Sequence, residues 1–183
     1  MKATVFRFSL YAALFEIAFY IVSSVLIKLA AGNYDTEEIV GYAGILACLS
    51  FVYFGIRHYR DHVNSGSVSF SQAVKIGLLI VLVPSVCFGL TDTLYVTIFD
   101  PHFYEKYSAH MIDELRKSIP ATQLPIKIKE MKAQMDFYKS PFVNFMLMFV
   151  TVAAIGIVIT LLSAVLLMRK SATKSDLSPF LQN

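Results

Sequence analysis

Four long apolar segments with almost no charge constrain this chain more than any other feature. They run over residues 8–27, 39–56, 76–99 and 142–168. A helix needs about 20 apolar residues to cross the hydrocarbon core of a bilayer, and each segment approaches or exceeds that length. The composition agrees, because 56% of the 183 residues are hydrophobic and only 16% are charged. The sequence therefore predicts an all-α integral membrane protein built as a four-helix bundle.

The composition and motifs also argue against several other classes of protein. A formal net charge of +3 is too small for a nucleic-acid-binding arm, and two cysteines cannot staple a disulfide-rich scaffold. The chain has no glycine-rich phosphate loop, no nucleophile elbow and no paired catalytic carboxylates. We therefore expect no enzymatic activity, no cofactor, no metal site and no nucleic-acid partner.

Local signals predict where two of the helices begin. In the run Ser69-Phe70-Ser71-Gln72, the Ser69 hydroxyl is placed to cap the third long helix before it enters the bilayer. Asp100-Pro101 has an N-cap residue followed by proline, which favours the first helical position, so we expect a further helix to begin there.

We expect one membrane domain over residues 1–183, in which residues 100–140 form an insertion between the third and fourth spans. Apolar residues recur there at helical spacing, and Pro120 and Pro125 break the segment into two amphipathic helices. Such a pair lies on a membrane surface or packs together. Its apolar stripes form a candidate interaction surface for a protein partner or lipid headgroups: Phe103, Tyr107, Met111, Leu115, Met131, Met135 and Tyr138.

The charges in the short loops predict an orientation in the membrane. The loop over residues 31–38 carries only acidic side chains, whereas basic residues exceed acidic ones in residues 57–69 and near both termini. Cytoplasmic loops of membrane proteins carry an excess of Lys and Arg. We therefore expect both termini in the cytoplasm and the insertion on the opposite side.

Three stretches resemble a known family. They are residues 66–77 (GSVSFSQAVKIG), 100–107 (DPHFYEKY) and 162–170 (LSAVLLMRK). Together they resemble the small four-span bacterial membrane proteins grouped as domain of unknown function 4199. The resemblance implies four spans, an outward helical insertion and a place in the bacterial inner membrane, and it implies no particular activity.

Glu16 is the strongest pointer to function. It lies near the middle of the first apolar segment, and at helical spacing it shares a face with Ser9, Ala13, Tyr20 and Ser24. A carboxylate at this depth is costly and must face protein or a cavity. One interpretation is a site that titrates or binds a cation, for which Lys75 is a candidate partner. The other is a structural hydrogen bond to Tyr20 or to a hydroxyl on another helix.

Asp92 is the second intramembrane acid, close to the outer end of the third segment. Lys28 at the outer end of the first segment is a candidate ion-pair partner, and we interpret Asp92 mainly as a tether between helices.

Small residues recur at helical spacing in the second and fourth segments. They are Gly41, Gly44 and Cys48 in the second, and Gly156, Thr160 and Ala164 in the fourth. Small faces let helix backbones approach closely in lipid, so we expect helix packing within the chain, with a homo-oligomer contact as the alternative.

Two functions remain open at this point. The first is a non-enzymatic scaffold that presents the helical insertion to a partner at the outer membrane surface. The alternative is a small proton-coupled transporter that works as an oligomer and uses Glu16 as its titrating group.

Overall fold

The structure, a computed structural model, describes residues 1–29 and 34–169. Within these residues every regular element is helical. The four long helices are α1 (Lys2–Leu29), α2 (Tyr34–His58), α3 (Phe70–Leu94) and α6 (Pro141–Leu167). Short π-helical turns extend α2 as η1 (Tyr59–Val63) and α3 as η2 (Tyr95–Phe99). All four long helices are long and apolar enough to cross a membrane. The predicted all-helical fold with four candidate spans is confirmed.

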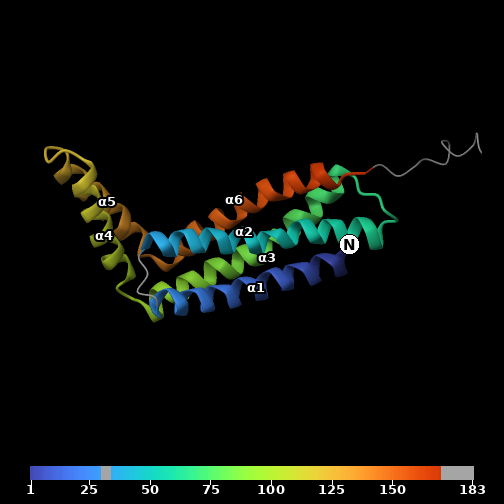
Figure 1. Cartoon of the computed structure of the whole chain (residues 1–183), viewed down its shortest axis with the longest axis horizontal. Coiled ribbons are helices and arrows are strands. Elements are labelled where there is room, and N and C mark those ends of the chain that lie inside the picture. The colour runs from blue at the N-terminus through green and yellow to red at the C-terminus, as the bar shows by residue number, and fades with distance from the viewer. Residues whose placement is uncertain (30–33, 170–183) are drawn as a thin grey trace, which may run out of the picture.

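The long helices lie side by side (Figure 1). Helices α1 and α6 each pack against both α2 and α3, and the α3–α6 contact is the most extensive of all. The first residues of α1 and the last residues of α6 lie at one end, which we call the terminal end. Helices α4 (Phe103–Ser118) and α5 (Leu124–Tyr138) form a hairpin that projects from the opposite end, the hairpin end.

The apolar core lies in the terminal half of the four long helices. It gathers large aliphatic side chains from the second half of α2, the first half of α3 and the last part of α6, including Leu49, Ile56, Ile76, Ile80 and Leu167. Toward the hairpin end, the core cluster reaches no further than Ile45 on α2 and Val152 on α6. The space between the helices is therefore filled differently at the two ends.

Large apolar side chains also cover the outward faces of the long helices. Leu166 is 74% exposed and Phe142 is 71% exposed, and Leu14, Leu46 and Leu82 also point outward. Soluble monomers rarely expose a continuous apolar surface of this kind, whereas lipid solvates it without cost. This surface agrees with a membrane protein.

Small residues allow the close approach of α3 and α6. A Cβ atom added at Gly77 would lie 2.5 Å from Cγ2 of Thr160, and one added at Gly156 would clash with Cγ1 of Val81. Gly44 on α2 faces the ring of Phe19 on α1 in the same way. These contacts lie within the chain, as expected. Gly41 is the exception, because a Cβ there would meet nothing within 4 Å.

One of the two predicted helix starts is confirmed, and the other is wrong. Ser69 caps α3 and forms a full capping box, in which Gln72 N donates to Ser69 Oγ and Ser69 N donates to Gln72 Oε1. The start predicted at Pro101 is wrong, because α4 begins at Phe103. The backbone N–H of Asp100 closes η2 by donating to the carbonyl of Tyr95 (2.8 Å), so this residue ends the preceding element.

Gly156→Ala is expected to lower the stability of the folded protein in detergent. The added methyl group meets Val81, whose branched side chain has little rotamer freedom in a helix, and overpacking of this kind costs about 1–3 kcal/mol. Gly41→Ala is the matched control and is expected to leave the melting temperature unchanged. Equal melting temperatures for the two variants would contradict the packing of α3 on α6.

Candidate ligand-binding cavity

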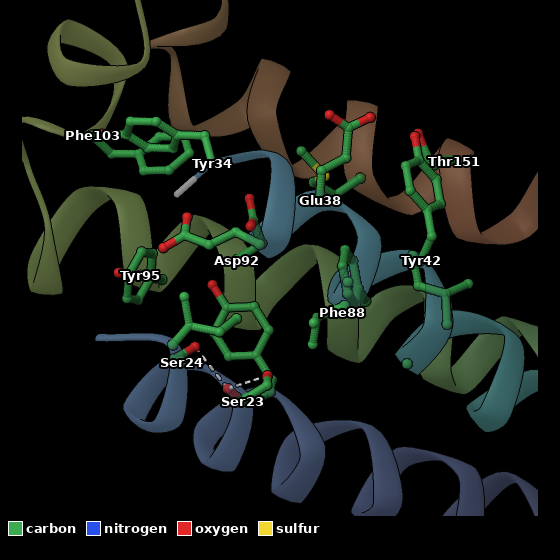
Figure 2. A pocket seen from close by; sticks show the side chains of 18 of the residues that line it. Ser23, Ser24, Tyr34, Glu38, Tyr42, Phe88, Asp92, Tyr95, Phe103 and Thr151 are labelled. Atoms are coloured by element: carbon green, nitrogen blue, oxygen red, sulfur yellow. Dashed lines mark hydrogen bonds between the residues drawn. The ribbon is translucent and has the colours of Figure 1, made fainter. Parts of the chain in front are cut away.

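A cavity of about 440 Å³ occupies the hairpin end, where the apolar core stops. Side chains from α1, α2, α3 and α6 form its walls, and side chains from α4 and α5 complete it. Figure 2 shows Asp92, Tyr95, Tyr34 and Phe103 grouped on one side of the cavity. Small-molecule sites typically have volumes of about 300–1,000 Å³, so this cavity is large enough for an organic ligand.

Glu16 lies in the wall contributed by α1. It is 6% exposed, and neither of its carboxylate oxygens has a hydrogen-bond partner among the described residues. The predicted helix face is present, because Ser9 and Ala13 are buried and Tyr20 and Ser24 are half-buried. Among the described residues, the structural hydrogen bond that was the other interpretation is not formed. Glu16 is thus a buried acid that borders a cavity.

The serine hydroxyl groups of α1 that line the cavity are occupied within their own helix. Ser23 and Ser24 donate to the backbone carbonyl of Tyr20, at 3.1 and 2.7 Å (Figure 2). Such bonds to the preceding turn are common for serine in apolar helices. These hydroxyls therefore add polarity to the cavity wall without binding Glu16.

Asp92 in the α3 wall is held by a residue that the sequence analysis missed. The side-chain amide of Asn144, which is fully buried on α6, donates to Asp92 Oδ2 (3.0 Å) and to Thr93 Oγ1 (3.1 Å). The hydroxyl of Tyr104 on α4 donates to Oδ1 of the same asparagine. Burial, together with the charge of Asp92, raises the pKa of Tyr104, so its hydroxyl stays protonated as a donor. One side chain therefore joins α3, α4 and α6.

Of the two lysines considered as partners of the buried acids, Lys75 is not found beside them. Lys75 is exposed in the second turn of α3 toward the terminal end, and it does not line the cavity. The side chain of Lys28 lies outside the described part of the structure.

The candidate interaction surface on the hairpin is mostly turned inward. Met131 is buried, and the other six residues of that set are half-buried. Four of them line the cavity: Phe103, Tyr107, Met135 and Tyr138. The rings of Phe103 and Tyr107 stack at a centroid distance of 5.9 Å, and Tyr34 on α2 packs edge-on against both. The hairpin thus uses these side chains to cover the hairpin end.

The cavity lining is biased toward acidic and aromatic side chains. Four carboxyl groups line it, namely those of Glu16, Glu37, Glu38 and Asp92, whereas its described lining includes no Lys, Arg or His. Seven tyrosines also line it: Tyr20, Tyr34, Tyr42, Tyr95, Tyr104, Tyr107 and Tyr138. Sequence reasoning treated Glu37 and Glu38 as loop charges. The signal that places Glu37 here is its helical spacing with Gly41, Gly44 and Cys48, which continues the small face of α2.

Asn144→Leu is expected to destabilise the protein and to loosen α4. The change leaves the polar groups of Asp92, Thr93 and Tyr104 without their partner, and an unsatisfied buried group costs about 1–3 kcal/mol. The melting temperature in detergent should fall, and amide hydrogen exchange in Phe103–Ser118 should accelerate.

The matched control for this prediction is Thr151→Val on the same helix. The Thr151 hydroxyl donates only to the Leu147 carbonyl one turn earlier (2.8 Å), so its loss is expected to change little. An Asn144→Leu variant with the wild-type melting temperature and wild-type amide hydrogen exchange in α4 would contradict the role of Asn144 in joining α3, α4 and α6.

Comparison with known proteins agrees with the resemblance stated from the sequence. A family model described as "Protein of unknown function (DUF4199)" matches residues 7–169. No curated protein and no solved structure matches the chain. The function must therefore be argued from the cavity.

Proposed function

Because the chain belongs to the DUF4199 family, whose function is unknown, we propose its function from the cavity itself: a small multi-pass membrane transporter that exchanges its ligand for a proton on Glu16. The observation that carries the proposal is the buried carboxyl group of Glu16, which borders a cavity of small-molecule size and has no hydrogen-bond partner in the described structure. This is the second of the two functions expected from the sequence.

The surroundings of Glu16 favour a protonated acid when the cavity is empty. An ionised carboxylate in a membrane span needs a counter-ion or donors, and Glu16 has neither among the described residues. The titratable groups near it are Asp92 and Cys87 from α3, Cys48 from α2 and Tyr20 on its own helix. None of them supplies a positive charge. A ligand that stabilises the ionised form of Glu16 would therefore displace the proton. This linkage couples movement of the ligand to movement of the proton.

The proposal includes a location and an orientation. We place the protein in a bacterial inner membrane with both termini in the cytoplasm, because of the basic residues near the terminal end. In this orientation the hairpin and the cavity face the extracytoplasmic side. Asn144 and Tyr104, which tie the hairpin to α3 and α6, then lie where a transporter opens and closes toward that side.

Glu16→Gln is expected to abolish proton-coupled transport while the fold remains intact. Purified protein is reconstituted into vesicles with an internal pH-sensitive dye and an imposed pH gradient. A panel of small amines, amino acids, sugars and carboxylates is then added in turn. We expect at least one compound to move protons through the wild-type protein and none to do so through Glu16→Gln, whose melting temperature should be unchanged because the lost acid has no bonding partner.

Two results would contradict this proposal. One is a wild-type protein that moves no protons with any compound of the panel. The other is a Glu16→Gln variant that retains the wild-type flux.

The scaffold function is a second candidate, and one surface feature favours it. Ile126 and Phe137 on α5 are 64% and 63% exposed, and their spacing of eleven residues puts them on one helix face. Exposed apolar side chains on one helix face outside the four long helices can contact a protein partner.

Replacing Ile126 and Phe137 together by Asp is expected to abolish cross-linking of such a partner in intact cells. The double substitution should leave membrane insertion unchanged, because neither side chain is buried. Failure of the wild-type protein to cross-link any partner would remove the support for this candidate.

A further inference from the structure

We infer that the ligand of the cavity is a monovalent organic cation, an alkylated or aryl-substituted ammonium compound, held by Glu16 and by the tyrosine rings of the cavity lining. This inference rests on the proposed function and names the class of ligand. Its first support is the charge of the lining, since four carboxyl groups and no described basic side chain border the cavity. Among the described lining residues, a carboxylate or phosphate ligand would meet only charges of its own sign.

Glu16 supplies the anchor for the positive charge. It is more than nine-tenths buried, lines the cavity and has two oxygens without partners in the described structure. A buried carboxylate without a partner is unstable, and an ammonium group satisfies it by charge and, where it carries N–H groups, by hydrogen bonds. Asp92 adds negative charge to the same cavity while Asn144 holds its side chain in place.

The aromatic side chains supply walls that suit the apolar part of such a ligand. Tyr34 packs edge-on against Phe103 and Tyr107 at centroid distances of 6.1 and 5.5 Å, and Tyr95 packs against Phe103 at 6.4 Å. These rings come from α2, α4 and η2 and meet beside Asp92 (Figure 2). Faces of aromatic rings attract ammonium groups, and aromatic cages recognise quaternary ammonium in this way.

The same observations argue against a metal ion as the ligand. Within the described chain, no three His, Cys, Asp or Glu side chains gather closely enough to share a metal ion. The cavity volume of about 440 Å³ is also far larger than a bare ion requires. Separated carboxylates among aromatic walls fit an organic cation better than they fit a coordination sphere.

The inference is tested with three benzyl compounds that differ in charge, two of which have the same shape. Benzyltrimethylammonium is the cation, neopentylbenzene is its neutral carbon isostere, and phenylacetate is a small aromatic anion. Binding of each to the full-length protein in detergent is measured by calorimetry. We expect saturable binding of the cation and none of the other two. Equal binding of the neutral isostere, binding of phenylacetate, or no binding of the cation would overturn the inference.

Variants distinguish the contribution of the Glu16 charge to binding from that of the aromatic rings. Glu16→Gln is expected to weaken binding of the cation at least tenfold. Asp113→Asn, which removes one negative charge from the exposed face of α4 outside the cavity, should leave binding unchanged. Tyr34→Leu should weaken binding about 2- to 30-fold through the lost ring, whereas Tyr34→Phe should retain it. Weakening of equal size in Glu16→Gln and Asp113→Asn would contradict the assigned site.

One further measurement needs no variant. Dicyclohexylcarbodiimide modifies protonated carboxyl groups in apolar surroundings, so it should label Glu16 in the wild-type protein. Benzyltrimethylammonium should protect Glu16 from labelling, and neopentylbenzene should not. Labelling that the cation leaves unchanged would overturn the inference.

If another class of compound drives Glu16-dependent proton flux in vesicles, the ligand class is wrong and the proposed transport function stands.

Discussion

The structure depends on one constraint: lipid offers no hydrogen bonds to side chains on the outward faces of the four long helices. Leucine, valine and phenylalanine therefore cover those faces, as they do at Leu166 and Phe142. Polar side chains in the same helices must point inward, toward each other or toward a cavity. Four carboxyl groups line the cavity at the hairpin end, whereas buried polar side chains of the other half, such as Ser9 and Thr160, are small and uncharged, and the apolar core forms in that half.

The inward polar residues at the hairpin end are joined to the hairpin itself. Small residues let α3 and α6 approach closely through Gly77 and Gly156. Beyond that contact, Asn144 adds a polar link between the two helices, because its amide binds Asp92 and its carbonyl oxygen accepts from Tyr104. Because Tyr104 belongs to α4, the position of the hairpin is coupled to the packing of the long helices. A movement of one therefore requires rearrangement of the other.

Much of this fold follows from the sequence because it depends on local patterns. Apolar length predicts the four long helices, Ser69 and Gln72 predict the start of α3, and helical spacing predicts the buried face of Glu16. The partner of Asp92 did not follow, because Asn144 is 52 residues away and stands at the edge of an apolar segment with no local pattern around it. The inward direction of the hairpin side chains likewise depends on long-range packing, which periodicity does not encode.

The two intramembrane acids differ in their surroundings, and this difference assigns them different roles. Asp92 accepts a hydrogen bond from a fully buried amide that also binds two other groups, so its position is fixed by the fold. Glu16 lines the same cavity, and no described residue binds its carboxyl group. An unsatisfied buried acid lowers stability, and a fold that needed only rigidity at this position would be better served by an alanine or leucine. Its presence therefore supports the proposal that Glu16 serves binding, with Asp92 holding the wall of the proposed site.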